Sequence, residues 1–356
     1  MREERVKKVV RYLDDIGADA ILLSSGYNMR YISGFSGATG YVWISKNKKA
    51  VLTDSRYTVQ AKQEAEGFTV LQVEQGYQKL VKTILQEEKV ATIAIESKDM
   101  LCHEFEQWKR AFPQMEWVFV GDEISNLRRI KTAEELHCIA KAEEIGDIAF
   151  EKILSQIKPG VTELEIAAYL EFYMKQNGAE GLSFDTIVAS GVNSAMPHAV
   201  PTRKKIENGD FVTMDFGCLY QGYCSDMTRT VVVGKANEKQ KKIYQTVLEA
   251  QELALEQICA GKTGAQVDAY ARNWIEKAGY GACFGHGLGH SVGLFIHEGP
   301  RLSPNDSTIL RANMTETVEP GIYIENFGGV RIEDLVVVTK HGCDNLTRSE
   351  KRLIEL

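Results

Sequence analysis

Two aspartates lie in one predicted hairpin over residues 211–233, which reads FVTMDFG, CLYQGY and then CSDMTRTVVV. Side chains alternate between the two faces of a strand, so Asp215 and Asp226 can meet on one face if the strands pair. A single aspartate in such a place is more often a solvated residue at a strand end. Because apolar strand residues flank both aspartates, a paired carboxylate site and two solvated strand ends both stay open as interpretations.

Three of the seven histidines fall within residues 284–303, which read FGHGLGHSVGLFIHEGPRLS. His286 and His290 are four residues apart, as in the helix of zinc proteases. The interleaved glycines break such a helix and no glutamate follows His286, so that motif is excluded. In an extended strand, residues four apart also share a face, and glycines let the backbone approach a ligand closely. The spacing of His286, His290 and His297 therefore favours a polar site on a strand, against the common role of single histidines as core or surface residues.

The third candidate segment, residues 315–338, reads TETVEPGIYIENFGGVRIEDLVVV. Glu319 ends an apolar strand and precedes proline, which holds its backbone extended and fixes where the carboxylate points. Arg331 and Glu333 share a strand face, and each places a charge inside an apolar run. One salt bridge on an edge strand would explain Arg331 and Glu333, but it would not explain Glu319.

Together, four strand-borne carboxylates and one histidine would form an oxygen-rich site for divalent metal ions. Without cations the carboxylates would repel one another and raise one another's pKa. Two divalent ions would neutralise four carboxylates, and manganese, cobalt or zinc suits such ligands better than copper. Two adjacent metals can hold a hydroxide and polarise a carbonyl, which is what a hydrolase requires. Whether these strands meet depends on the fold.

The first half of the chain alternates apolar runs with helical stretches. Residues 2–16 place Val6, Val9 and Leu13 on one face of an amphipathic helix. Strands are predicted at 20–23, 41–44, 50–53, 69–73, 90–95 and 117–120, and helices near 55–66, 76–88 and 100–111. This alternation predicts an α/β domain over residues 1–125. The glycine- and serine-rich segment 33–40 is predicted to be a loop.

The second half carries repeated helix-start signals. Thr132 and Glu135 have the spacing of a capping box, in which each side chain satisfies the other residue's free backbone N–H. The same spacing recurs at Thr162/Glu165 and Thr263/Gln266, and in a looser form at Asn237/Gln240. Helices are predicted at 132–157, 162–177, 237–260 and 263–278, and strands at 185–190, 210–217, 225–233, 314–319 and 330–338. Runs of strands between runs of helices predict an α+β domain over residues 126–356.

Composition excludes several classes of protein. The chain has 356 residues, 44% hydrophobic and 26% charged, which is ordinary for a globular protein of two domains. A net charge of −7 argues against nucleic acid as a partner. No run of ~18 apolar residues would span a membrane, and the N-terminus lacks the features of a signal peptide. Seven scattered cysteines without a CxxC pair predict free thiols and a cytoplasmic protein.

Four segments, in this order, resemble the pita-bread metallopeptidases, specifically prolidase and aminopeptidase P. They read SFDTIVASGVNSAMPH, MDFG with YCSDMTRT, FGHGLGHSVGL with IHEGPRLS, and TVEPGIY with GGVRIED. The likeness covers about residues 130–340. A weaker one in NMRYISGFSGATG and VLTDSRY implies a creatinase-like N-terminal domain. Two features depart from the family pattern: the residues that lead into the EPG segment, which read ANMTETVEPG, and Phe295, where an acidic residue is frequent. The exact substrate specificity therefore stays open.

The resemblance implies five metal ligands that hold two divalent ions per subunit, with manganese favoured over cobalt or zinc. These ligands are Asp215, Asp226, His290, Glu319 and Glu333.

Further roles follow from the same resemblance. Glu319 would also move the proton of the attacking water. His198 would contact the region of the scissile peptide bond, and His297 would lie near the carbonyl that is attacked. Arg331 and Tyr323 would support the metal centre and the substrate.

The resemblance also implies a substrate pocket. Phe184 and Ile296 would line a proline pocket, and Arg301 would bind the substrate carboxylate, as in some members of the family. His286 is typical of the family but is not a ligand.

The activity implied is hydrolysis of the peptide bond before proline, with an Xaa-Pro dipeptide favoured because the chain is short for aminopeptidase P. Xaa-Pro aminopeptidase activity on longer peptides is the alternative. A non-catalytic binding module is disfavoured because all five ligands are present. Methionine aminopeptidase is disfavoured because it explains neither the N-terminal domain nor the MPH segment. The resemblance further implies a homodimer, with the SGFSGATG loop as the candidate contact.

Overall fold

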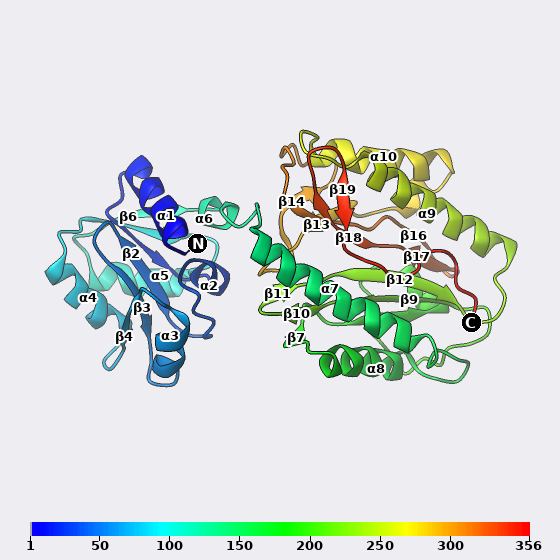
Figure 1. Cartoon of the computed structure of the whole chain (residues 1–356), viewed down its shortest axis with the longest axis horizontal. Helices are drawn as coiled ribbons and strands as arrows, with labels where there is room; N and C mark the ends of the chain where they lie inside the picture. The colour runs from blue at the N-terminus through cyan, green and yellow to red at the C-terminus, as the bar shows by residue number, and fades with distance from the viewer. Residues whose placement is uncertain (1) are drawn as a thin grey trace. The chain divides into compact units, whose positions relative to one another are not determined.

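The computed structural model describes residues 2–356. The chain divides into two compact units, the first ending at Arg128 and the second running from Arg129 to Leu356. Figure 1 shows the helices and strands of each unit, with labels on many of them. No described helix combines the length and the apolar composition needed to cross a membrane. All seven cysteines are free thiols, as their scattered positions predict.

The first unit is built on a six-stranded mixed sheet in the order β4-β3-β2-β1-β5-β6. Its strands are β1 (Ala20–Leu23), β2 (Tyr41–Ser45), β3 (Lys49–Thr53), β4 (Thr69–Gln72), β5 (Thr92–Glu96) and β6 (Glu116–Val120). Strand β1 pairs antiparallel with β2 and parallel with β5. Each strand agrees with a predicted apolar run to within two residues. The prediction of an α/β domain is confirmed.

Six helices accompany this sheet. They are α1 (Arg2–Ile16), α2 (Gly26–Ser33), α3 (Thr58–Glu64), α4 (Tyr77–Glu87), α5 (Cys102–Ala111) and α6 (Glu123–Asn126). Helix α2 is absent from the predicted elements because eight residues carry too short an apolar pattern. A tertiary contact holds its start: buried Glu96 accepts hydrogen bonds from the backbone N–H groups of Ser24 and Ser25 and from the Asn28 amide. Gly34, with φ of 86°, ends the helix in the left-handed region that glycine favours.

The second unit has four long helices, which are α7 (Ala133–Ile153), α8 (Glu163–Gln176), α9 (Glu238–Gln257) and α10 (Gly264–Lys277). All four predicted capping boxes form, including the looser Asn237/Gln240 pair. Helix α7 ends at Ile153, four residues before the predicted end. Two short 3₁₀ helices, η1 (Gly191–Ala195) and η2 (Gly281–Cys283), complete the helical elements.

The strands of the second unit form several small sheets. The strands that precede α9 are β7 (Gly181–Leu182), β8 (Ile187–Ser190), β9 (Phe211–Phe216), β10 (Cys218–Tyr220), β11 (Tyr223–Cys224) and β12 (Met227–Val232). Those that follow α10 are β13 (Gly289–Ser291), β14 (Glu298–Leu302), β15 (Thr315–Val318), β16 (Gly321–Ile324), β17 (Gly328–Arg331), β18 (Asp334–Val338) and β19 (Cys343–Asn345). The sheet orders include β12-β9-β8, β15-β18-β19 and the pair β13-β14.

Two predicted strands differ from the observed ones at an acidic residue: one begins later than predicted and the other is divided in two. The predicted strand 225–233 begins only at Met227, so Asp226 lies just before β12. The predicted strand 330–338 is divided into β17 and β18, and Glu333 lies in the break. Within the hairpin, β12 and β9 are antiparallel and Asp215 is opposite Thr228. The interruptions free the carboxylates from the strict alternation of a continuous strand.

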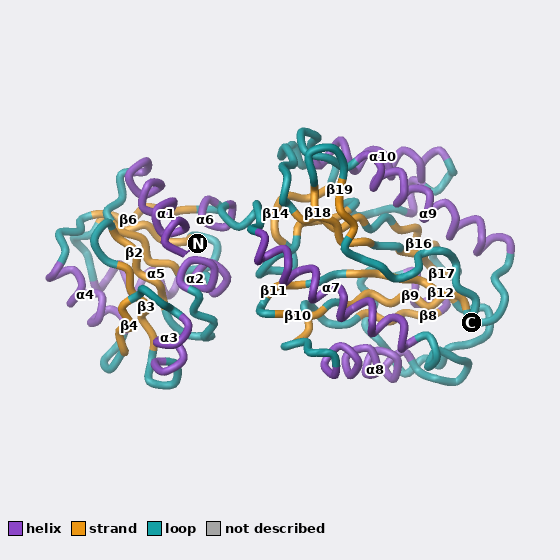
Figure 2. The backbone as a smooth tube through the Cα atoms, viewed as in Figure 1, coloured by secondary structure: helices purple, strands orange, loops and turns teal. Residues whose placement is uncertain are grey.

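Pairs of helices cover both sides of the strands of this unit, α9 with α10 on one side and α7 with α8 on the other (Figures 1 and 2). One hydrophobic cluster joins α9 and α10 to β16, β17 and β18. A second cluster joins α7 and α8 to β8, β9 and β12. The strands that carry the candidate site therefore lie between two cores, which hold their backbones rigid. The prediction of an α+β second domain is confirmed.

Glu316 is a fully buried carboxyl group in β15, opposite Val336 of β18. Neither carboxyl oxygen has a hydrogen-bond partner within the described chain. Burial raises the pKa of Glu316 well above its usual range, although Lys131 acts in the opposite direction. An unsatisfied buried polar group costs about 1–3 kcal/mol, so this residue destabilises the fold.

Replacing Glu316 by valine is therefore expected to raise the free energy of unfolding by about 1–3 kcal/mol near neutral pH. The raised pKa means that the folded protein holds a proton that the unfolded chain releases above about pH 4.5. The wild type therefore loses stability as pH rises, and the gain in the variant is larger near pH 8 than near pH 5. Urea unfolding of the metal-free proteins measures this. The exposed Asp344→Val, in the same sheet, should change stability by less than about 0.5 kcal/mol. An equal gain in both variants would contradict the prediction.

Candidate metal centre

A cavity of about 520 Å³ opens among the strands of the second unit. That volume is typical of a small-molecule site. The lining residues are Phe184, Asp185, Ile187, Pro197, His198, Asp215, Asp226, His286, Gly287, Gly289, His290, His297, Arg301, Ser303, Glu319, Arg331 and Glu333. Acidic side chains and histidines from segments far apart in the sequence thus converge on one space.

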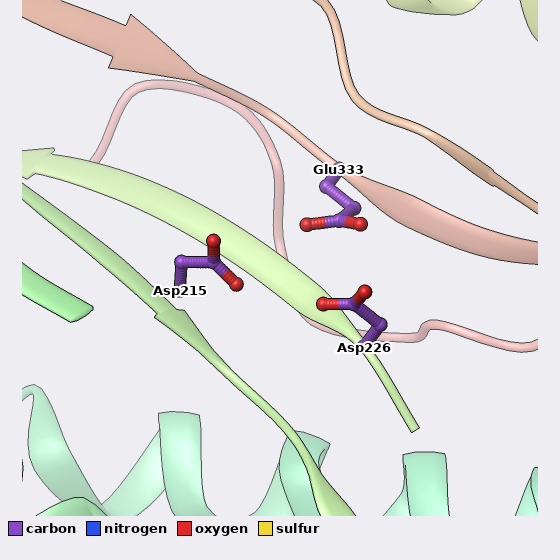
Figure 3. Close-up of side chains that lie close together, drawn as sticks. All are labelled: Asp215, Asp226 and Glu333. Carbon is purple, nitrogen blue, oxygen red and sulfur yellow. The ribbon is translucent and has the colours of Figure 1, made fainter. Parts of the chain in front are cut away.

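Three carboxylates form the centre of this group. Asp215 comes from β9, Asp226 from the residue before β12, and Glu333 from the break between β17 and β18. One carboxylate oxygen from each lies within 4.8 Å of the others, a spacing at which one metal ion could be held. Figure 3 shows the three carboxylates pointing toward one another from separate segments.

His290 and Glu319 approach the same centre. The Nε2 atom of His290 lies 3.4 Å from Oδ2 of Asp226 and 3.6 Å from Oε1 of Glu319. Thr317 ties the two residues together, because its hydroxyl accepts from the His290 backbone N–H and donates to Glu319 Oε1 at 3.0 Å. Gly289 makes this approach possible, since a Cβ there would lie 1.9 Å from the Thr317 carbonyl oxygen.

Burial and mutual repulsion dominate the electrostatics of the cluster. Burial, followed by the charges of neighbouring carboxylates, raises the pKa of Asp226 and of Glu333 well above the usual range. Burial raises the pKa of Glu319 to about 7. For His290, burial and the nearby His297 lower the pKa to about 3, so its ring is neutral at neutral pH. A neutral ring leaves one nitrogen lone pair available for a metal.

The donor set fits divalent metal ions. Oδ1 of Asp215 and Oε1 of Glu333 are buried and lack a hydrogen-bond partner within residues 2–356. The Nδ1 atom of His290 lies 3.2 Å from the Ser291 carbonyl oxygen. When Nδ1–H donates to that carbonyl, Nε2 becomes the free ligand atom, a frequent arrangement around metal-binding histidines. Unsatisfied carboxylate oxygens beside a neutral imidazole are the ligands that hard and borderline divalent ions prefer.

Arg331 holds the cluster from one side. Its guanidinium donates to Oδ2 of Asp215 at 2.6 Å, to the Tyr323 hydroxyl at 2.8 Å and to the Thr228 hydroxyl at 3.0 Å. The Thr228 hydroxyl donates in turn to Oε2 of Glu333 at 2.6 Å. One buried cation therefore orients two of the carboxylates, directly and through a hydroxyl group.

The predicted substrate residues are only partly at the cavity. His198, His297, Arg301 and Phe184 line it. The ring centroids of His297 and His290 are 4.6 Å apart. Ile296 lies in a hydrophobic cluster against which Phe184 packs, outside the lining residues.

Tyr323 is not among the residues that line the cavity either, and it contacts Arg331 instead. Its hydroxyl accepts from Arg331 and lies 3.0 Å from Nε2 of His286. Nδ1 of His286 lies 2.8 Å from the Gly287 carbonyl oxygen. The tyrosine thus connects Arg331 to the imidazole instead of facing the cavity.

Comparison with known proteins identifies the family of the chain. The profile of metallopeptidase family M24 matches residues 137–340, which is more than half of the chain. The chain belongs to metallopeptidase family M24. The profile of the creatinase/prolidase N-terminal domain matches residues 5–130.

Relatives of this M24 peptidase align over the whole chain. An Xaa-Pro dipeptidase from Pyrococcus horikoshii is 44% identical over 99% of both chains. The solved structure of an Xaa-Pro dipeptidase from Bacillus anthracis is 43% identical, with a TM-score of 0.97 and complete coverage of both chains. The crystal structure of an X-Pro aminopeptidase from Thermotoga maritima is 41% identical, with a TM-score of 0.92 over 99% of this chain and 100% of the other. The resemblance to pita-bread metallopeptidases, the fold class and the expectation of an enzyme are confirmed.

Two residues that contact the candidate ligands are absent from the sequence-based prediction. Thr228 lies two residues after Asp226 and opposite Asp215 in the hairpin, so its place in the sequence is a local signal that could have identified it. Glu143 of α7 accepts hydrogen bonds from the Asp226 backbone N–H at 3.3 Å and from the Thr347 hydroxyl at 2.6 Å. Glu143 is far from both partners in the sequence, so no local pattern indicates its role.

Proposed function

We propose that this M24 peptidase hydrolyses the peptide bond that precedes proline, with an Xaa-Pro dipeptide as its preferred substrate. The observation that carries the proposal is the buried carboxylate and histidine cluster at a cavity that also contains His198, His297 and Arg301. The names of the 44% identical relative from Pyrococcus horikoshii and of the structure from Bacillus anthracis support the same substrate.

The proposed metal ligands are Asp215, Asp226, His290, Glu319 and Glu333, and two divalent ions, manganese in the first place, are the proposed cofactor. When bound, such ions supply an activated water and a Lewis acid for the peptide carbonyl. The unsatisfied oxygens of Asp215 and Glu333 support this assignment. Arg331, through its bond to Asp215, would hold the ligand set in place.

The other side chains at the cavity provide the proton transfers and the hydrogen bonds to the substrate. We assign proton transfer between the attacking water and the proline nitrogen to Glu319, whose carboxylate is fixed by the Thr317 hydroxyl. Burial lowers the pKa of His297, so a neutral ring N–H would donate to the oxygen of the attacked carbonyl. A positioned donor at a developing oxyanion typically contributes about 2.7–4 kcal/mol. His198, which also lines the cavity, would contact the region of the scissile peptide bond.

Arg301 is the residue on which the choice between dipeptides and longer peptides depends. Its guanidinium makes no hydrogen bond or ion pair with any described residue, in contrast to the fully engaged Arg331. A free guanidinium at a cavity is suited to a carboxylate, which it can bind through two parallel hydrogen bonds. The C-terminal carboxylate of a dipeptide is the proposed partner.

Replacing Arg301 by alanine is expected to raise KM for alanyl-proline about 10- to 100-fold with little change in kcat. A charge-assisted hydrogen bond contributes about 1.5–3 kcal/mol, and the group does not contact the reacting carbonyl. Hydrolysis of alanyl-proline and of alanyl-prolyl-alanine would be measured with added Mn²⁺ and again with a chelator. Exposed Arg311, which does not line the cavity, provides the matched control Arg311→Ala.

The substrate pair separates the candidate functions. Metal-dependent cleavage of the dipeptide alone supports the dipeptidase. Faster cleavage of the tripeptide, unaffected by Arg301→Ala, would replace it by an Xaa-Pro aminopeptidase, the alternative that the Thermotoga maritima relative favours. Binding of Mn²⁺ without cleavage of either peptide would contradict the proposed substrate.

We further propose a homodimer to which the SGFSGATG loop of the first unit contributes. The family resemblance supports this assembly, and light scattering that gives the mass of a monomer would contradict it.

A further inference from the structure

The loop that carries His198 depends on backbone anchors. Residues 191–201, which begin with the 3₁₀ helix η1, connect β8 to the segment before β9, and His198 is exposed in the part of this loop that follows η1. Its ring makes no hydrogen bond to any described residue. The position of this imidazole at the cavity is therefore set by the path of the loop and not by hydrogen bonds of the ring itself.

Glu163 is the main anchor of both ends of this loop. It is the first residue of α8 and its side chain is fully buried. At one end, Oε1 accepts from the Ser190 backbone N–H at 2.7 Å and from the Ser190 hydroxyl at 2.8 Å. At the other end, Oε2 accepts from the Thr202 backbone N–H at 3.0 Å and from the Thr202 hydroxyl at 2.6 Å. The amide of Asn193 donates to both oxygens, at 3.0 and 3.2 Å.

An acidic residue in the first turn of a helix is usually exposed, and its negative charge interacts favourably with the helix dipole. Glu165 of the same helix does so here, since it forms the capping box and is exposed. Glu163 is instead enclosed by hydrogen-bond donors from the loop. A buried carboxylate is costly unless its oxygens are satisfied, so its five partner groups and its burial indicate a specific structural task.

The loop is also joined to the carboxylate cluster. Arg331, which binds Asp215, donates to the Pro197 carbonyl oxygen at 3.3 Å. The Ser194 hydroxyl accepts from the Gly329 backbone N–H at 2.8 Å. These contacts hold the middle of the loop near β17, while Glu163 fixes where the loop begins and ends.

We infer that Glu163 is a positioning residue for His198: by joining Ser190 to Thr202 it holds the loop so that the imidazole faces the substrate. The inference rests on the proposed function insofar as His198 contacts the substrate. A carboxylate is required because both ends of the loop present a backbone N–H. A glutamine side chain has one acceptor oxygen, so it can satisfy one end and must point its own N–H₂ group at the donors of the other.

Glu163→Gln is therefore expected to lower kcat/KM for alanyl-proline about 100-fold, the effect of misplacing a substrate-contacting group by about 1 Å. Mn²⁺ uptake, measured by equilibrium dialysis, should stay at the wild-type level because no proposed ligand lies on the loop. The matched control is Glu165→Gln in the same helix, where glutamine preserves the capping box. Thr202→Val, which removes one hydroxyl donor, is a milder second variant if Glu163→Gln does not fold.

A double-mutant cycle with His198→Ala distinguishes positioning from a general structural role. If Glu163 acts through His198, then Glu163→Gln or Thr202→Val will change kcat/KM less than about twofold in the His198→Ala background. The same loss in both backgrounds, or no loss in the wild-type background, would overturn the inference.

Hydrogen–deuterium exchange of residues 191–202 supplies a readout that does not depend on the substrate. Exchange should rise in Glu163→Gln and stay unchanged in Glu165→Gln, and unchanged exchange in both would overturn the inference. If the wild type cleaves no proline peptide, the proposed function fails, while the exchange experiment still decides whether Glu163 anchors the loop.

Discussion

Asp226→Asn is expected to abolish both divalent-metal binding and peptidase turnover. Asp226 lies at the centre of the cluster. One of its oxygens is within 4.8 Å of an oxygen of Asp215 and of Glu333, and Oδ2 is 3.4 Å from Nε2 of His290. An amide keeps the shape of the side chain but removes the negative charge that a divalent ion requires. Mn²⁺ affinity should fall more than about 100-fold, and kcat/KM to below about one-thousandth of the wild-type value. Isothermal titration and a peptide-hydrolysis assay measure the two effects.

The same substitution should increase the stability of the metal-free protein. Burial and the charges of Glu333, Asp215 and Glu319 raise the pKa of Asp226, so an ionised carboxylate there is unfavourable without metal. Removing the charge relieves that penalty. We expect Asp226→Asn to be more stable than the wild type in the presence of a chelator and less stable than the wild type with Mn²⁺.

Asp344→Asn, at an exposed position of β19, is the control and should leave affinity, turnover and stability unchanged. His290→Ala should also lose metal and turnover, since its neutral Nε2 is a proposed ligand. Full activity in either Asp226→Asn or His290→Ala would exclude the proposed metal centre.

The second large effect is a pH-dependent stabilisation by metal. The pKa of Glu319 is raised to about 7, and burial together with neighbouring carboxylates raises those of Asp226 and Glu333 well above the usual range. In the metal-free folded protein these groups hold protons that an unfolded chain releases above about pH 4.5. The folded state therefore loses stability as pH rises through the folded pKa values.

Buried histidines oppose this trend only at lower pH. The pKa of His290 is lowered to about 3 and that of His286 to about 4, so both stay neutral in the folded protein. Their contribution to stability is present above about pH 6.5, the unfolded value, and is lost as pH falls. Above about pH 6.5 the histidine contribution to the slope fades, and the buried carboxyl groups dominate the slope up to about pH 8.

Thermal unfolding between about pH 6.5 and 8 is expected to show a falling Tm for the metal-free protein. With Mn²⁺ present the decrease should become smaller, because cations replace the protons in the cluster while Glu316, outside the cluster, still titrates. A metal concentration of 100 Kd would add about 2.7 kcal/mol of stability. The difference between the two curves should shrink in Asp226→Asn. A metal-induced shift in Tm that is equal at both ends of this pH range would contradict the coupling of protons to metal.

The N-terminal sheet was predictable because its strands are short apolar runs separated by polar helices. Each strand of the first unit follows from local composition. Helix α2 does not, because its start depends on Glu96, which is distant in the sequence. The four capping boxes of the second unit were likewise predictable, since both partners lie within one turn.

By itself, the sequence determined which side chains are available for the chemistry. Asp215, Asp226, His290, Glu319 and Glu333 each stand out as a polar residue in an apolar or glycine-rich strand segment, and such anomalies are local. Resemblance to known motifs then connected them to a dinuclear metal site.

The tertiary structure alone decided how these residues are oriented. The breaks at Asp226 and Glu333, the position of Tyr323 behind Arg331, and the Glu163 anchor of the His198 loop all depend on contacts between distant segments. Local propensity and spacing carry no information about such contacts. They arise only when the strands are packed between the two hydrophobic cores, where every buried donor must find an acceptor.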